Sequence, residues 1–237
     1  MTLNVNPAEV KKFGEAAHAW WDPDGEFGAL HDINPLRAAY VADRTRLRDR
    51  RVLDVGCGGG LIAEALAARG ARILGIDMAE EAIAVARAHQ RESGFRNEYR
   101  QIPVEDLAAE SPGEFDAVVC MELLEHVPEP GSVVRACGRL ARPGGDVFFA
   151  TINRNLLAGF LVIFGAERVL RLMPRGTHHY GGFVRPAEIA AWGREAGLAL
   201  RNLSGLRYNP FTRRCALTRN SPVNYLMHLR RESDADI

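Results

Sequence analysis

The sequence predicts a doubly wound α/β fold, and three features of residues 51–151 carry that prediction. Short apolar or β-branched runs alternate there with helical patterns. A glycine-rich turn, residues 56–60, follows the first of these runs, and Asp77 ends the second. Alternation at this spacing indicates a parallel sheet with right-handed crossovers. The glycine turn and the later acidic residue are typical of a nucleoside site at the point where the strand order reverses.

The elements are predicted in order along the chain. Residues 1–48 form an N-terminal helical cap, with helices at 7–21 and 35–47 separated by a segment whose Pro23, Gly25 and Gly28 break helical periodicity. The core occupies residues 49–151. Its strands are expected at 51–55, 71–76, 97–102, 114–120 and 145–151, and its helices from the glycine turn to 69, at 79–93 and at 133–140.

The pattern changes after Thr151. We expect an insertion at 152–184 after the fifth strand, and then the C-terminal part of the sheet at 185–237. The latter contains a helix near 186–196 and strands at 198–206 and 213–219. Because α/β domains often exceed 200 residues around one core, the chain of 237 residues is predicted to be a single domain.

Charge and cysteine content narrow the function classes. Lysine plus arginine equals aspartate plus glutamate at 30 each, so no global field attracts nucleic acid. The four cysteines are widely spaced and residues 1–14 lack a signal-peptide pattern, which predicts a reducing, cytoplasmic location. The longest apolar run, residues 156–166, is shorter than the roughly 18 residues that a membrane-spanning helix needs.

The turn after the first strand predicts the chemistry of the ligand. Its glycines let a ligand approach the backbone where a Cβ would collide, and Asp77 is placed to accept both hydroxyls of a ribose. Gly58-x-Gly60-x-x-Ala63 also fits a dinucleotide pattern, which is weak alone. The carboxylate of Asp54 would repel a pyrophosphate, whereas it suits the cationic sulfonium and ammonium of S-adenosylmethionine. S-adenosylmethionine is therefore the favoured cofactor, and an NAD-dependent oxidoreductase is the alternative.

Motifs distributed along the chain resemble the UbiG-type ubiquinone biosynthesis O-methyltransferases, which are class I S-adenosylmethionine-dependent methyltransferases with a Rossmann-like sheet. The motifs are Val52–Gly60, Trp20-Trp21-Asp22, Leu30-His31-x-Ile33-Asn34-Pro35-Leu36-Arg37, Met121-Glu122-x-Leu124-Glu125-His126-Val127-Pro128, Thr151-x-Asn153-Arg154-Asn155 and Gly205-Leu206-x-Tyr208-Asn209-Pro210. The resemblance spans residues 13 to about 228. It implies the activities 2-polyprenyl-6-hydroxyphenol methylase and 3-demethylubiquinol 3-O-methyltransferase, on prenylated catechol or quinol rings. Methylation of another small molecule is the alternative.

The resemblance also implies donor-binding residues. Arg37 is chemically suited to the carboxylate of the donor, the backbone after the third strand to its adenine, and Met121 either to packing near the donor or to the core. The expected donor-binding set is Arg37, Asp54, Gly56, Gly58, Asp77, Met78, Val104, Glu105 and Met121.

Proton removal from a catechol hydroxyl requires a base or a metal. The residues after the fourth strand, Glu122, Glu125 and His126, have a spacing that would put all three on one face of a helix. One hypothesis is that they bind a divalent metal, Mg²⁺ above all, which chelates both catechol oxygens. The other is that no metal binds and that Glu122 or His126 is the catalytic base; His31 is a further base candidate.

The predicted insertion suggests where in the cell the protein acts and what it binds besides its substrates. Residues 155–176 combine an apolar half with Arg168, Arg171 and Arg175, which suits an anionic membrane surface, although a lid helix packed on the core explains the same pattern. A polyprenyl acceptor favours peripheral association with the inner face of the cytoplasmic membrane, and other ubiquinone-biosynthesis proteins are candidate partners. A donor-binding assembly subunit without turnover is a non-enzymatic alternative, which the acidic and histidine cluster disfavours.

Overall fold

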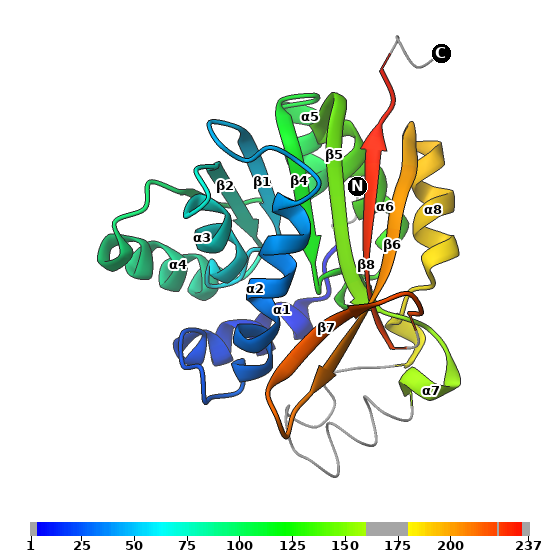
Figure 1. The fold of residues 1–237 in the computed structure, drawn as a ribbon. Coiled ribbons are helices and arrows are strands. Elements are labelled where there is room, and N and C mark those ends of the chain that lie inside the picture. Colours follow the sequence, from blue (N-terminus) through cyan, green and yellow to red (C-terminus); the bar gives the residue numbers. More distant parts are fainter. Residues whose placement is uncertain (1–3, 160–179, 222, 234–237) are drawn as a thin grey trace.

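The computed structural model describes residues 4–159, 180–221 and 223–233. It has the predicted doubly wound α/β fold, with eight strands in the order β3-β2-β1-β4-β5-β8-β6-β7 (Figure 1). The parallel strands are β1 (Arg51–Val55), β2 (Arg72–Asp77), β3 (Glu98–Gln101), β4 (Phe115–Met121) and β5 (Ala141–Ile152). The strand order reverses between β1 and β4, so this is the switch point at which such sheets bind ligands.

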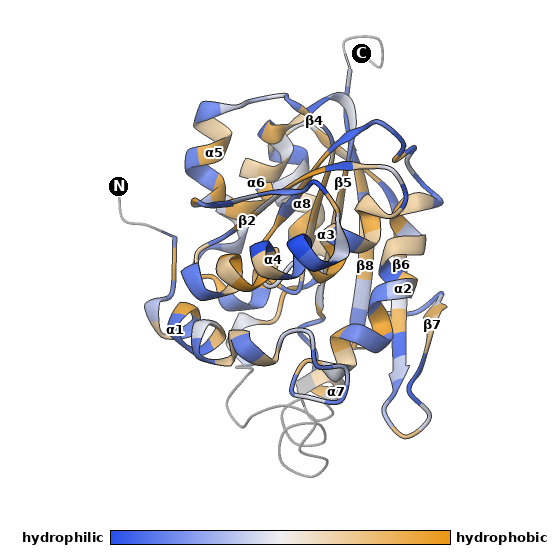
Figure 2. Cartoon of the chain, turned by 90° about the vertical axis from the view of Figure 1, so that its left-hand side faces the viewer, coloured by the Kyte–Doolittle hydropathy of each residue, from blue (hydrophilic) through white to orange (hydrophobic). Residues whose placement is uncertain are grey.

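Helices cover both faces of the sheet. On one face, α2 (Gly28–Ala42), α3 (Leu61–Ala67) and α4 (Glu80–Ser93) bury a cluster that includes Val41, Leu66 and Ile83. On the other, α5 (Val104–Glu110), α6 (Pro130–Leu140) and α8 (Pro186–Glu195) bury a second cluster. Apart from Asp116, the residues of β4 are apolar, and β5 is buried from Gly145 to Ile152, as expected for strands that helices cover on both faces (Figure 2).

The C-terminal part of the sheet contains three strands where the sequence predicted two. Strands β6 (Leu198–Asn209) and β7 (Arg214–Thr218) match the two expected strands, and they pair as an antiparallel hairpin. The additional strand, β8 (Asn224–Arg231), runs antiparallel between β5 and β6. Its residues Tyr225 to Leu229 are buried, and their short apolar run was the signal that sequence reasoning missed.

The cap differs from the prediction at its second helix. Helix α1 (Pro7–Ala16) and the 3₁₀ turn η1 (Ala17–Ala19) match the first expected helix, but α2 begins at Gly28 rather than at residue 35 and contains Pro35. An internal proline removes one helical hydrogen bond. Burial of Ala38, Tyr40 and Val41 against the sheet offsets that loss, so the helix continues through the proline.

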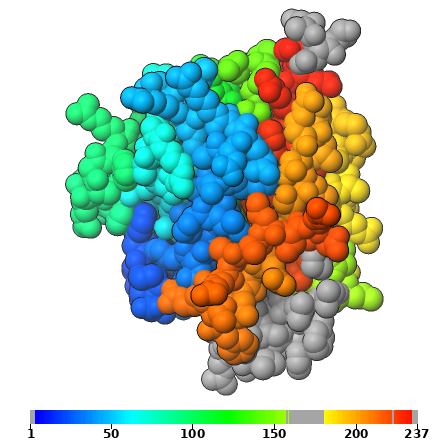
Figure 3. Space-filling model, in the orientation of Figure 1, coloured from blue at the N-terminus to red at the C-terminus, as the bar shows by residue number. Residues whose placement is uncertain are grey.

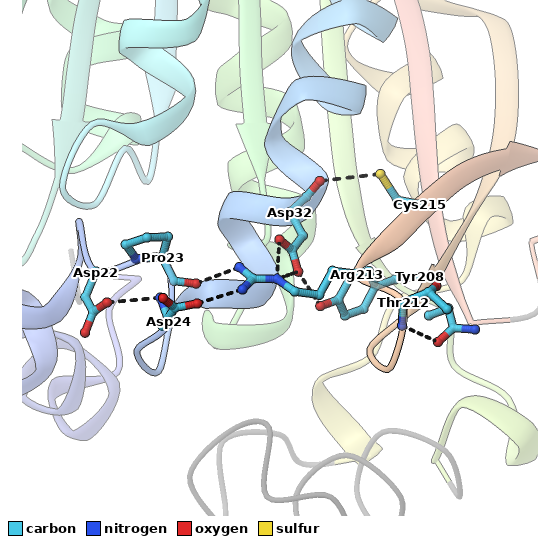
Figure 4. A network of polar contacts seen from close by, with 9 residues as sticks. Asp22, Pro23, Asp24, Asp32, Tyr208, Thr212, Arg213 and Cys215 are labelled. Carbon is cyan, nitrogen blue, oxygen red and sulfur yellow. Dashed lines mark hydrogen bonds and ion pairs between the residues drawn. The ribbon is translucent and has the colours of Figure 1, made fainter.

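Arg213, in the turn before β7, connects the β6–β7 hairpin to the cap (Figure 4). The Arg213 guanidinium donates to Asp32 Oδ1 at 3.0 Å through Nε, to Asp24 Oδ1 at 2.6 Å through Nη1 and to the Pro23 carbonyl at 2.9 Å through Nη2. Tyr208 donates its hydroxyl to Asp32 at 2.6 Å. The hairpin therefore lies directly against the cap, as Figure 3 also shows.

The predicted insertion is described only at its ends. Helix α7 (Leu156–Gly159) follows β5, and the 3₁₀ turn η4 (Tyr180–Gly182) precedes α8. Arg168, Arg171 and Arg175 lie outside the described residues.

Candidate functional site

A cavity opens at the carboxyl ends of β1, β2 and β4, where the strand order reverses. Four loops of the core and the N-terminal segment form its wall. Of the predicted site residues, the wall contains Gly56, Gly58, Asp77, Met78, Val104, Glu105, Glu122 and His126. The fold thus brings most of the predicted donor-binding residues and both catalytic candidates to one cavity.

The glycine loop has no room for side chains. Gly58 has φ +50°, in the left-handed region that favours glycine, and a Cβ there would collide with the ring of Trp20. The cap is attached to this loop, because Trp21 Nε1 donates to the Gly59 carbonyl at 2.9 Å. The glycine loop therefore lines the cavity with its backbone, and Trp20 and Trp21 of the cap pack against it.

Asp77 connects the ends of two strands. Its Oδ2 accepts a hydrogen bond from the Gly58 amide and its Oδ1 one from the Ala79 amide, both at 2.9 Å. Burial raises the pKa of Asp77, and these backbone hydrogen bonds oppose that shift. A carboxylate has about four acceptor sites, so the one at Asp77 can still accept from ribose hydroxyls.

The part of the cavity wall that follows β3 has both apolar and polar side chains. Ile102, Pro103 and Val104 follow β3 and offer a flat apolar wall, and Glu105 lies beside them. Asn4 crosses the rim, donating to Glu105 Oε1 at 2.8 Å.

Glu122 lies directly after β4 with φ +56°, an unusual conformation for a residue with a side chain. The side chain is 20% exposed, and its Oε1 lies 3.4 Å from Nη1 of Arg37. Burial and repulsion from Glu125 raise the pKa of Glu122 to about 7, against the opposing charges of Arg37 and His126. A carboxyl group with such a pKa can exchange a proton near neutral pH.

His126 lies in the 3₁₀ turn η2 (Leu124–His126) on the same side of the cavity. Its Nδ1 is 2.8 Å from Oε2 of Glu9, which comes from α1. The ring of Phe13 contacts it edge-on, with ring centroids 5.0 Å apart. The imidazole is therefore held by two residues of the N-terminal helix.

The expected metal-binding face does not form as predicted. Residues 122–126 are not an α-helix, and the three side chains have different partners: Arg37 for Glu122, Thr151 at 2.7 Å for Glu125 and Glu9 for His126. Two carboxylates and an imidazole have the donor chemistry of a divalent-metal site. Within residues 4–159, 180–221 and 223–233, however, no group of three His, Cys, Asp or Glu side chains is arranged to hold a metal ion. These side chains do not fit a metal in this arrangement, and we derive no step through one.

Three predicted donor-binding residues lie behind the cavity wall rather than on it: Arg37, Asp54 and Met121. Burial lowers the pKa of Arg37, while the carboxylates of Glu122, Asp54 and Glu125 oppose that shift. Burial and the neighbouring Asp77 raise the pKa of Asp54 to about 8. Met121 is packed in the apolar cluster beneath α2 and α3. The other base candidate, His31, is also absent from the wall and has its Nε2 2.9 Å from the Trp20 carbonyl.

Sequence reasoning missed the contribution of the N-terminal segment. Asn4, Glu9, Phe13 and Trp20 all line the cavity. Helix α1, which carries Glu9 and Phe13, could be predicted, but the docking of the N-terminal segment onto the core depends on contacts between residues more than 100 positions apart in sequence. No local pattern encodes such a contact.

Comparison with known proteins relates the chain to methyltransferases. A family model described as a methyltransferase domain matches residues 53–149. A ubiquinone biosynthesis O-methyltransferase from Pseudomonas aeruginosa is 53% identical over 230 residues, which are 97% of this chain and 99% of that protein. A protein of the same description from Pseudomonas syringae pv. tomato is 54% identical with the same coverage.

Solved structures show the same fold. Magnesium protoporphyrin IX methyltransferase from Synechocystis PCC 6803 with bound SAH has a TM-score of 0.67 and 16% sequence identity, over 94% of each chain. The PH0226 protein from Pyrococcus horikoshii has a TM-score of 0.66 and 14% identity, over 90% of this chain and 95% of that one. At these identities the likeness concerns the fold alone.

Proposed function

The chain belongs to the ubiquinone biosynthesis O-methyltransferase family, and from this premise we propose that it methylates a hydroxyl group of a prenylated catechol or quinol. It is an S-adenosylmethionine-dependent O-methyltransferase. The observation that carries the proposal is the joint presence, in one cavity wall, of the glycine loop with Asp77 and of the two proton acceptors Glu122 and His126. A subunit that only binds the donor and assembles with other proteins would not need the proton acceptors Glu122 and His126.

The chemistry of the cavity wall suggests how S-adenosylmethionine lies in it. We propose that the backbone of Gly56 and Gly58 lies against the donor, that Asp77 accepts from its ribose hydroxyls, and that residues 102–105 contact its adenine. Arg37 and Asp54 lie behind the wall, and we propose that they face the carboxylate and the ammonium of the donor. Because the pKa of Asp54 is about 8, its carboxyl group is ionised at neutral pH mainly when a cation such as that ammonium lies near it. We propose that Met121 supports the wall through its packing.

The bound donor supplies a methyl group on a positively charged sulfur, so the leaving group is already activated. The acceptor oxygen forms a bond to the methyl carbon while the carbon–sulfur bond breaks. The electron pair of the broken carbon–sulfur bond stays on sulfur. The hydroxyl proton has to leave the oxygen, since a neutral phenol is a weak nucleophile. Glu122 and His126 are the groups in the wall that can take it. Holding donor and acceptor in line supplies much of the remaining rate enhancement.

The prenyl chain of the acceptor implies access from a lipid surface, and we propose peripheral association with an anionic membrane. Leu156 and Phe211 support it: they are 84% and 81% exposed, and α7 and the tip of the β6–β7 hairpin lie at the end of the molecule to which β4 points (Figure 1). No helix in the described part of the chain is long and apolar enough to cross a bilayer.

The experiment compares a prenylated catechol, the same ring without the prenyl chain, and a prenylated ring whose two hydroxyls are already methylated. We expect turnover with the first, a lower kcat/KM with the second and none with the third. Equal kcat/KM for the first two would contradict the assignment of a prenylated acceptor. The same assay in excess chelator tests the metal hypothesis, because loss of turnover on chelation and recovery with Mg²⁺ would show that a metal is required.

A further inference from the structure

The indole ring of Trp20 lies across the glycine loop. A Cβ atom added at Gly58 would collide with Cε2 of Trp20, and one added at Gly59 would collide with Cδ1. These two carbon atoms are the neighbours of Nε1 in the indole ring, so Nε1 lies over the segment from Gly58 to Gly59. Trp20 also lines the cavity and is only 9% exposed. Its ring nitrogen is therefore placed where the glycine loop meets the cavity.

This ring nitrogen has no hydrogen-bond partner in the part of the chain that the structure describes. A buried N–H group without an acceptor destabilises the folded protein, so such groups usually have a partner. The next residue shows the contrast, because Nε1 of Trp21 donates to the Gly59 carbonyl at 2.9 Å. The loop thus provides an acceptor for one of two adjacent indoles, and a ligand in the cavity can provide one for the other.

Contacts that do not involve Nε1 fix the position of the Trp20 ring. The ring packs against Phe27, with ring centroids 4.2 Å apart. The backbone N–H of Trp20 donates to the Ala17 carbonyl at 3.1 Å, and its carbonyl lies 2.9 Å from Nε2 of His31. Because the cap holds the residue in this way, its N–H group is preorganised to donate to a ligand.

The donor has three kinds of hydrogen-bond acceptor: its adenine, its ribose oxygens and its carboxylate. The proposed donor orientation puts the adenine beside residues 102–105 and the ribose beside Asp77. Trp20 instead adjoins His31 of α2, the helix that also carries Arg37, the residue proposed to face the carboxylate. A carboxylate is also the strongest acceptor of the three, because it is ionised. These observations favour the carboxylate as the partner of the indole.

We propose that the indole N–H of Trp20 donates a hydrogen bond to the carboxylate of S-adenosylmethionine. This inference rests on the proposed function and deepens it, because it adds a residue of the cap to the donor site of the core. The amino-acid end of the donor is then held between the glycine loop and the cap. The donor site is therefore complete only when the cap is packed on the loop.

The test compares Trp20→Phe with the wild type in titration calorimetry with three ligands. S-adenosylmethionine and S-adenosylhomocysteine both have the carboxylate, but the second lacks the methyl group and the positive charge on sulfur. Methylthioadenosine lacks the whole amino-acid end. We expect Trp20→Phe to raise the Kd about 10-fold for the first two ligands and less than about two-fold for methylthioadenosine.

A second measurement follows the N–H group itself. The chain has three tryptophans, and the indole N–H signal of Trp20 in a nitrogen–proton spectrum is identified by its loss in Trp20→Phe. This signal should move downfield when S-adenosylmethionine or S-adenosylhomocysteine binds, because the N–H gains an acceptor. The signal of Trp21 should move less, since its N–H already donates to the loop.

The matched control is Trp192→Phe. Trp192 lies on α8 and packs against the cluster on the other face of the sheet from α2. This variant should leave the Kd of all three ligands unchanged. Thermal unfolding without ligand verifies that both variants are folded.

Three results would overturn the inference in a wild type that binds S-adenosylmethionine. One is an unchanged Kd for S-adenosylmethionine in Trp20→Phe, and another is an equal loss of affinity for methylthioadenosine, because the indole would then not recognise the carboxylate. The third is a loss for S-adenosylmethionine that S-adenosylhomocysteine does not share, since it would point to the charge on sulfur. A wild type that binds none of the three ligands would instead refute the proposed donor site, so the two failures are distinguishable.

Discussion

The carboxylate of Asp77 accepts a hydrogen bond from the amide of Gly58 at 2.9 Å. The acidic residue that ends β2 therefore fixes the glycine loop that follows β1, in addition to facing the cavity. Loop geometry and ligand binding are coupled through this one side chain.

Replacement of Asp77 should accordingly weaken donor binding. We expect Asp77→Ala to raise the Kd for S-adenosylmethionine by about 10- to 100-fold, since it removes charge-assisted hydrogen bonds worth roughly 1.5–3 kcal/mol. Titration calorimetry measures the change. Asp106→Ala, an exposed acidic residue on α5, is the control and should bind as the wild type does. Unchanged affinity in Asp77→Ala would place the donor elsewhere.

Glu122 should make stability depend on pH. Its pKa in the folded protein is about 7, above the ordinary value of 4.5. The neutral carboxyl is thus favoured by folding, and its stabilising contribution is complete below pH 4.5 and lost as pH rises through 7. Glu122→Gln should therefore gain stability relative to the wild type as the pH rises above 4.5, by up to about 3 kcal/mol at pH 8. Denaturant unfolding at pH 4 and pH 8 tests this, and an equal difference at both would contradict it.

Arg213 should hold the β6–β7 hairpin against the cap. Its guanidinium has three contacts with residues 23–32, so Arg213→Gln should increase amide hydrogen exchange in residues 22–32 and 209–215. Arg214→Gln, the exposed neighbour, serves as the control. Unaltered exchange in Arg213→Gln would mean that the ion pairs seen in Figure 4 do not join the two segments.

Membrane association should combine charge and apolar contacts. We expect wild-type protein to bind anionic vesicles, more weakly as salt rises, because the attraction to lipid headgroups is screened. Reversing the charge of Arg168, Arg171 and Arg175 should reduce that binding, at about 1 kcal/mol for each arginine, and Phe211→Ser should reduce the salt-resistant part. Reversal of three other exposed arginines is the control: Arg48, Arg69 and Arg91. Equal sedimentation with anionic vesicles for wild type and all variants would contradict the proposal.

Much of the fold could be predicted because its signals are local. Strand runs such as residues 51–55 are bounded by glycines or charges, and the loop and Asp77 follow at a fixed spacing. Strand β8 was missed although its residues Tyr225 to Leu229 form a short apolar run, because the place of that run between β5 and β6 depends on pairing with strands distant in sequence.

The candidate site, like the fold, could be predicted where its residues directly follow a strand. The residues of the glycine loop and of the β2 and β4 ends were found because each follows a strand whose position was clear. The helical geometry assumed for residues 122–126 was wrong, since Glu122 has a left-handed backbone and η2 is a single 3₁₀ turn. The contact of Glu9 with His126 could not be found from sequence, because it depends on how α1 docks.

The most direct test of the central claim is methyl transfer itself. Purified protein is incubated with S-adenosylmethionine that carries a labelled methyl group and with a prenylated catechol, and the product is analysed by mass spectrometry. The account predicts one labelled methyl group on a ring oxygen, with loss of turnover in the double variant Glu122→Gln, His126→Ala. Donor binding without any labelled product, or full turnover in that double variant, would contradict it.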